Sequence, residues 1–172
     1  MTEICTIGYE GAAWASFLAM LQQNGVEQVI DVRQLPLSRR PGFSKTSLSA
    51  GLAEAGIGYI HLRPLGTPAE GREANKRHDW PRFWAIVETS LTTPEAGLAL
   101  EHAADLARAR RSCLLCFEAD SCICHRRRVG ELLGERHGFT LRHLSVARPD
   151  GPTEVKPARA PRSRAQPRAA GR

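Results

Sequence analysis

The sequence lacks the long apolar run of roughly 18 residues that a bilayer-spanning helix requires, so it predicts no membrane protein. Its first residues, Met-Thr-Glu-Ile-Cys-Thr-Ile-Gly, contain neither the basic region nor the apolar region of a secretory signal. The five cysteines are an odd number, which together with the absent signal predicts reduced thiols in the cytoplasm. Apolar residues make up 42% of the chain, a share typical of globular proteins.

Positive charge is in excess but unevenly distributed. The 172 residues include 24 Lys and Arg against 18 Asp and Glu, which gives a net charge of +6. Residues 148–172 contain seven basic and two acidic residues, so the preceding 147 residues are close to neutral. Basicity often indicates a nucleic-acid partner, but here it points to the C-terminal segment rather than to the whole chain.

Short apolar runs alternate with amphipathic stretches, a pattern that predicts an α/β fold with a mostly parallel sheet and helices on both faces. We expect about five strands, at residues 3–7, 26–32, 57–62, 112–117 and 139–146. Helices are expected at residues 14–24, 45–55, 81–91, 95–110 and 126–137. Ser44 and Thr93 are the expected N-caps of two of them.

The composition changes at residue 148 to Pro, Ala, Arg and Ser, with Val155 as the one aliphatic residue larger than Ala. Such a segment buries too little apolar surface to offset the entropy of ordering it. We therefore predict a folded domain over residues 1–147 and a disordered basic tail over residues 148–172.

Polar residues follow each of the first four predicted strands. Ligands of open α/β sheets bind beyond the carboxyl ends of the strands, so these segments define a candidate site. They contain Gly8-Tyr9-Glu10-Gly11; Asp31, Arg33, Ser38, Arg39 and Lys45; His61 and Arg63; and Cys116, Glu118, Asp120, Cys122, Cys124, His125 and Arg126.

The ordered motifs resemble those of the bacterial and archaeal domain-of-unknown-function family 488. They are Thr6-Ile7-Gly8-Tyr9-Glu10-Gly11, Asp31-Val32-Arg33, Pro36-Leu37-Ser38-Arg39, Gly42-Phe43-Ser44, Tyr59, Leu65-Gly66, Leu115-Cys116-Phe117-Glu118 and Cys124-His125-Arg126. The resemblance covers about residues 4–144. It implies a compact α/β domain and does not by itself assign a reaction.

The first two loops favour anion binding. Gly8 and Gly11 flank Tyr9 in a turn whose backbone N–H groups could approach a phosphate or carboxylate, although the spacing matches no dinucleotide or Walker motif. The alternative for these glycines is a tight turn that needs positive φ. Asp31 and Arg33 share one side of a strand end, and Ser38 and Arg39 follow; Arg forks suit planar anions. The alternative there is a salt bridge.

The segment after the fourth strand has three compatible chemistries. Glu118 is a candidate nucleophile or general acid/base, because desolvation at a strand end raises a carboxyl pKa. Cys124 lies at a helix N-terminus beside His125, where a thiolate is stabilised. Metal binding would use Cys116, Cys122, Cys124 and His125, although their spacing lacks the usual pairs of structural zinc sites. The alternative is that these are buried packing residues.

Helical periodicity places His125 toward the sheet edge, Arg126 at a flank bordering the pocket and Arg127 in solvent. Residues 63–82 read as a long loop that carries Arg72, Lys76 and His78, which suggests a substrate lid that adds cations.

These residues predict an intracellular hydrolase or transferase for a small anionic substrate, of nucleotide or nucleic-acid origin. Glu118, His125 and Cys124 would be its catalytic groups, and Arg33, Arg39 and Arg126 would hold the anion. Two alternatives stay open. One is a non-catalytic module that binds nucleic acid through the tail, and the other is a Cys/His metal or redox site. The sequence predicts no particular cofactor and no oligomeric state.

Overall fold

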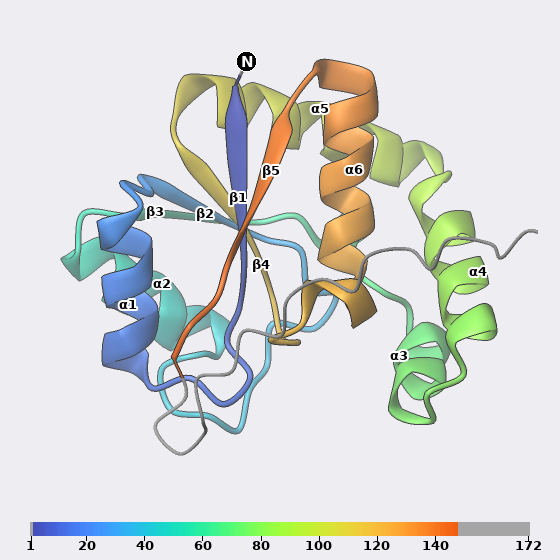
Figure 1. Cartoon of the computed structure of the whole chain (residues 1–172), viewed down its shortest axis with the longest axis horizontal. Helices are drawn as coiled ribbons and strands as arrows, with labels where there is room; N and C mark the ends of the chain where they lie inside the picture. Colours follow the sequence, from blue (N-terminus) through green and yellow to red (C-terminus); the bar gives the residue numbers. More distant parts are fainter. Residues whose placement is uncertain (1, 148–172) are drawn as a thin grey trace, which may run out of the picture.

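A computed structural model of the chain describes residues 2–147 and shows alternating strands and helices (Figure 1). The strands are β1 (Glu3–Gly8), β2 (Gln28–Asp31), β3 (Gly58–His61), β4 (Ser112–Cys116) and β5 (Thr140–Leu144). The helices are α1 (Trp14–Gln23), α2 (Lys45–Glu54), α3 (Ala69–Lys76), α4 (Trp80–Leu91), α5 (Pro94–Ala109) and α6 (His125–His137). Two 3-10 turns, η1 (Arg63–Leu65) and η2 (Ser121–Ile123), lie between them. The predicted tail lies outside the described residues.

The five strands form one sheet in the order β3-β2-β4-β1-β5, and all neighbouring strands are parallel. The predicted α/β class and the parallel sheet are thus confirmed. The chain runs outward from β1 to β2 and β3, returns to place β4 between β2 and β1, and ends at β5. Strands β2 and β4 are buried along their whole length, which explains the apolar pair Val29 and Ile30 of β2 and the apolar run Cys113–Cys116 of β4.

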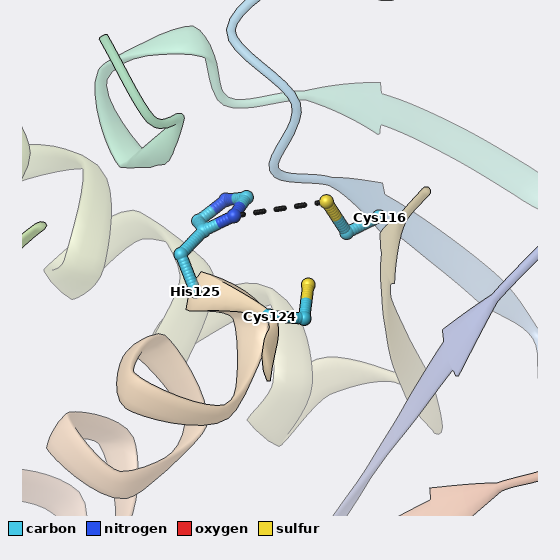
Figure 2. A group of neighbouring side chains, drawn as sticks. All are labelled: Cys116, Cys124 and His125. Carbon is cyan, nitrogen blue, oxygen red and sulfur yellow. Dashed lines mark hydrogen bonds between the residues drawn. The ribbon is translucent and has the colours of Figure 1, made fainter. Parts of the chain in front are cut away.

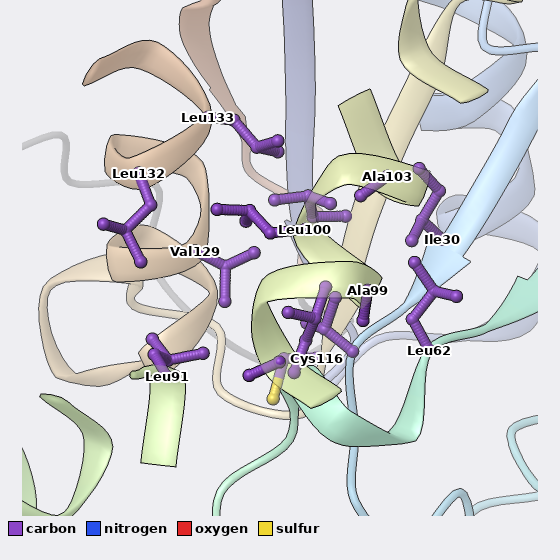
Figure 3. Packing of buried hydrophobic residues seen from close by; sticks show 14 of the residues in the cluster. Ile30, Leu62, Leu91, Ala99, Leu100, Ala103, Cys116, Val129, Leu132 and Leu133 are labelled. Carbon is purple, nitrogen blue, oxygen red and sulfur yellow. The ribbon is translucent and has the colours of Figure 1, made fainter. Parts of the chain in front are cut away.

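Helices cover both faces of the sheet, as expected. On one face, Phe17 and Leu21 of α1 and Leu48 and Leu52 of α2 pack against alternate residues of β1, β2 and β4. The other face is covered by α4, α5 and α6 (Figure 3). There the predicted stripe of α6, which consists of Val129, Leu132 and Leu133, is buried against the core.

The sequence-based expectation of a long loop over residues 63–82 was wrong. This segment contains η1 and the two-turn helix α3, and α4 already begins at Trp80. Residues of α3 such as Ala69, Glu70 and Arg72 favour helix by intrinsic propensity. Only Gly71 and Ala74 of α3 are buried, so the helix has no large apolar stripe by which periodicity could reveal it.

Ser44 stands at the N-cap of α2, as expected, but its side chain does not cap the helix. Its Oγ instead accepts a hydrogen bond from the Ser38 backbone N–H and donates one to the Ser38 carbonyl, and each of these distances is 3.0 Å. Ser44 therefore closes the loop after β2, while Thr93 caps α5 as predicted by accepting from the Ala96 N–H. Within the described residues, no helix has the length and apolar character needed to traverse a membrane.

Candidate active site

A pocket of about 750 Å³ lies beyond the carboxyl ends of the strands. Its lining comes from the segments after β1, β2 and β4 and from α3 and the start of α4. Strands β1 and β4 are neighbours, but α1 and α6, which follow them, pack on opposite faces of the sheet. The pocket therefore opens at a topological switch point, the usual ligand position in open α/β sheets.

Three chemically reactive side chains meet at the floor of this pocket. Cys116 ends β4, Glu118 follows it, and His125 begins α6. Cys116 Sγ lies 3.2 Å from Glu118 Oε2. It also lies 3.6 Å from His125 Nδ1, and Figure 2 draws this second contact. All three residues line the pocket, so a ligand in it can reach a carboxylate, an imidazole and a thiol together.

The orientation of His125 is set by the backbone of the neighbouring strand end. Its Nε2 lies 2.8 Å from the carbonyl oxygen of Val32, so Nε2–H donates to that carbonyl. In the neutral ring, Nδ1 then carries the lone pair and faces Cys116. Burial favours the neutral imidazole, but Cys124, Glu118 and the Val32 carbonyl together raise the pKa of His125.

A second thiol adjoins this group. Cys124 is fully buried at the N-cap of α6, and its Sγ belongs to a cluster with Cys116 Sγ and a His125 ring nitrogen, within 4.8 Å of one another. Burial, and then Cys116 and Glu118, raise the pKa of the Cys124 thiol. A hydrogen bond with Cys124 lowers the pKa of the Cys116 thiol. Burial and the Glu118 carboxylate raise this pKa by more, so the net shift is upward.

Three of the four residues suggested as metal ligands are thus brought together, whereas Cys122 is not. Cys122 is exposed in η2, where its backbone N–H donates to Asp120 Oδ1 over 2.8 Å. Cys124 also lies outside the pocket lining, so it faces the ligand space only through Cys116 and His125.

Close contact between the loops after β1 and β4 positions Glu118. A Cβ on Gly8 would lie 1.8 Å from the Glu118 carbonyl oxygen, so only glycine permits this approach. The Glu10 N–H also donates to the Phe117 carbonyl over 2.8 Å. On the other side, Asn75 Nδ2 of α3 lies 3.5 Å from Glu118 Oε1 and donates to the Ile123 carbonyl over 3.1 Å. Gly8 therefore leaves the space that the neighbouring loop occupies. Gly11 has positive φ and lines the pocket.

Asp31 and Arg33 form a buried ion pair, the alternative to an anion site that the sequence left open. Arg33 Nε and Nη2 donate to the two Asp31 carboxylate oxygens over 2.9 and 2.6 Å. Arg33 Nη1 donates to Tyr9 Oη and to the Phe43 carbonyl. Burial alone favours a neutral guanidine, but Asp31 raises the pKa of Arg33. Arg33 lines the pocket with its charge already compensated, so it is a poor choice for holding an anion.

Arg126 is buried and lies outside the pocket lining. Its guanidinium donates to the backbone carbonyls of Glu118 and Ala119 and lies 3.4 Å from Thr6 Oγ1. Arg126 therefore stabilises the loop that carries Glu118 by binding its backbone carbonyls. A helical wheel cannot predict this role, because the path of the loop decides it.

Other cations line the pocket. Arg39, which was expected, is exposed there beside Ser38. Arg72 and Lys76, expected on a lid, line it from α3. His78, expected there too, lines it from the segment between α3 and α4. Sequence reasoning missed Arg40, whose Nη2 donates to the Ala12 carbonyl over 2.7 Å. It also missed Asn75, whose place one turn of helix after Arg72 would have been a signal had α3 been recognised.

The exposed part of the pocket lining contains both apolar and charged side chains. Leu35, Leu37 and Phe117 are among the few large apolar side chains exposed in the described residues, and the exposed Arg39 and Lys76 line the same pocket. Thr67 also lines the pocket, and its Oγ1 is buried without a hydrogen-bond partner within residues 2–147. The pocket thus offers a ligand an exposed apolar patch and cationic groups.

The chain is an α/β protein with a pocket at the carboxyl ends of its parallel strands. A family model described as Domain of unknown function DUF488 matches residues 13–133, and the chain belongs to this family. Searches of curated proteins and of solved structures found no match. The expected family is thus confirmed, and the description of the family assigns no activity.

Proposed function

We propose that this protein is a cytoplasmic enzyme, a hydrolase or a transferase, that acts on a small organic anion. The observation that carries the proposal is the meeting of Cys116, Glu118 and His125 at the floor of a pocket with cationic walls. Buried polar groups are costly unless they are paired or used, and a catalytic pocket uses them.

The charge of the pocket favours an anionic substrate. Arg39, Arg40, Arg72 and Lys76 line it in addition to Arg33, against two carboxylates, those of Glu10 and Glu118. Arg33 is compensated by Asp31, and Lys76 pairs with Glu73, so the excess of positive charge comes from the three other guanidinium groups. Guanidinium groups bind carboxylates and phosphates in a planar, bidentate manner. The exposed apolar patch formed by Leu35, Leu37 and Phe117 would accept the uncharged part of the same molecule, such as a ring or an acyl chain.

Glu118 is the proposed general acid/base. It is half-buried, and Asn75 and the Arg126-supported loop hold it in place. His125 Nδ1 faces Cys116, since Nε2 is committed to the Val32 carbonyl, so the imidazole and the sulfur would act as a pair beside Glu118. Cys124, behind Cys116, would tune this pair rather than contact the substrate.

The test is a screen of the full-length protein against phosphate monoesters, phosphodiesters, nucleotides and carboxylic esters, followed by Glu118→Gln on the substrate found. Removing a general acid/base typically lowers kcat by about 10²–10⁴-fold. Asp105→Asn is the matched control, because Asp105 lies on the exposed surface of α5 and, within residues 2–147, forms an ion pair with Arg108 alone. Unchanged kcat in Glu118→Gln would remove Glu118 from the mechanism.

The alternative of a nucleic-acid-binding module rests on the basic segment 148–172, which lies outside the described residues. It stays a prediction. The structure favours the pocket over that alternative, because a module that bound through a tail would not need a thiol, an imidazole and a carboxylate together in a cavity.

A further inference from the structure

We propose that Cys116, Cys124 and His125 bind a divalent metal ion that prefers thiolate ligands, Zn²⁺, and leave its fourth position open to the pocket. The three ligand atoms lie within 4.8 Å of one another and come from side chains that point toward a common centre (Figure 2). Two cysteines and one histidine, with one position left for water or substrate, form a known ligand set of catalytic zinc.

The distances agree with tetrahedral zinc. Zn–S bonds of about 2.3 Å and Zn–N bonds of about 2.05 Å place sulfur and nitrogen about 3.6 Å apart and two sulfurs about 3.8 Å apart. Cys116 Sγ and His125 Nδ1 are 3.6 Å apart. Cys124 Sγ, within 4.8 Å of both, needs a shift of at most about 1 Å, which a side-chain rotation can supply.

The histidine is prepared for this role by its second nitrogen. Ligating histidines almost always donate their other ring N–H to a carbonyl or carboxylate, which fixes the tautomer and the ring orientation. The His125 Nε2 contact with the Val32 carbonyl is such a bond, and it directs the Nδ1 lone pair toward the sulfurs.

The ligands are also held by rigid elements. Cys116 ends β4, in the middle of the sheet, and Cys124 and His125 form the N-cap and first residue of the 13-residue helix α6. Burial raises the pKa of the free Cys124 thiol, but a bound metal ion deprotonates a thiol that coordinates it. A site on a strand end and a helix start changes little on binding, as a precise metal centre requires.

A disulfide between Cys116 and Cys124 is the rival use of the two sulfurs. It would leave the third member of the cluster unexplained, because a disulfide has no need of an imidazole nitrogen aimed at it. A metal ion uses all three atoms at once, so the geometry favours the ion.

The role of the ion rests on the proposed function, whereas its binding does not. Cys116 and His125 line the pocket and Cys124 lies behind them, so the remaining position faces the substrate space near Glu118. The ion would act there as a Lewis acid that lowers the pKa of a coordinated water, and Glu118, beside Cys116, would be the proton acceptor for that water.

The experiment is a metal analysis of the full-length protein purified without chelator, followed by titration of the metal-free protein with Co²⁺. We expect one ion per chain and a thiolate-to-cobalt charge-transfer band with the intensity of two sulfurs. The wild-type spectrum reports the ligands directly, so this arm does not depend on how any variant folds.

The variants are Cys116→Ser and Cys124→Ser, with Cys122→Ser as the control. Each of the first two should weaken Co²⁺ binding by at least about 100-fold, the upper end of what the loss of a supporting residue costs. Cys122→Ser should bind as the wild type does, because Cys122 is exposed and outside the cluster. Circular dichroism checks that each variant is folded.

A missing charge-transfer band, unchanged Co²⁺ affinity in folded Cys124→Ser, or a mass two hydrogens lower from a disulfide would each overturn the metal site. These outcomes are separate from the proposed function. Metal binding without any turnover would refute the enzyme alone, and Glu118-dependent turnover in metal-free protein would refute the catalytic role of the ion alone.

Discussion

Replacement of Asp31 by asparagine tests whether Arg33 is a structural cation or a ligand for anions. The Asp31 carboxylate is completely buried and accepts four hydrogen bonds. Three come from the N–H, Nε and Nη2 groups of Arg33, and the fourth comes from Tyr59 Oη over 2.7 Å. Burial and Asp31 raise the pKa of Tyr59, so its hydroxyl stays protonated and donates.

Asparagine has the same shape but replaces one carboxylate oxygen with an NH₂ group, which cannot accept. Two of the four donors therefore lose their acceptor, and the Arg33 charge is left without a counter-ion. Hydrogen bonds to charged groups contribute about 1.5–3 kcal/mol each. Breaking a buried ion pair on one side costs about 3–5 kcal/mol, a large share of a typical stability of about 5–15 kcal/mol.

The assay is urea unfolding followed by circular dichroism, with the free energy of unfolding as the result. We expect Asp31→Asn to lose about 4 kcal/mol, and Asp31→Leu combined with Arg33→Met to lose less than Asp31→Asn, because no uncompensated charge remains. Asp105→Asn, which breaks an exposed pair with Arg108, should lose at most about 1 kcal/mol. A loss below about 1 kcal/mol in Asp31→Asn would refute the reasoning and return Arg33 to the anion site.

Two further predictions concern the glycine contact and the thiols. Gly8→Ala should destabilise the protein by about 3 kcal/mol in the same assay, the upper end of overpacking costs, because its Cβ meets the backbone oxygen of Glu118. Gly97→Ala, near the start of α5 with nothing within 4 Å of the added Cβ, should instead stabilise it by about 0.5–1 kcal/mol. Equal effects of the two changes would contradict the close approach. In the native protein, a thiol reagent at neutral pH should label one of the five cysteines quickly, Cys122, because the other four are buried and the reagent cannot reach them. All five should react in urea, and rapid labelling of Cys113 in folded protein would disprove the packing.

The sequence predicted the sheet and five of the six helices to within one or two residues at most boundaries. These elements carry strong signals, namely apolar strands buried on both faces and helices with a stripe such as Val129, Leu132 and Leu133. Helix α3 escaped because only Gly71 and Ala74 of it are buried, so its pattern was indistinguishable from that of a polar loop.

For the candidate site, the position was predictable and the orientation of its side chains was not. Parallel strands end at one edge, so the meeting of Glu118 and His125 follows from their place after β4. The partners of Arg33 and Arg126 depend on how loops fold back: a carboxylate two residues away neutralises one, and two loop carbonyls engage the other. Periodicity describes strands and helices and contains no information on such loop paths.

We propose above all that the pocket beyond β4 is catalytic and that Glu118 acts there as the general acid/base. The most direct measurement is kcat of the wild type and of Glu118→Gln on the anionic substrate that the screen identifies, with Asp105→Asn alongside. The account predicts a fall of about 10²–10⁴-fold in Glu118→Gln and no change in the control. Equal kcat values for all three proteins would contradict it.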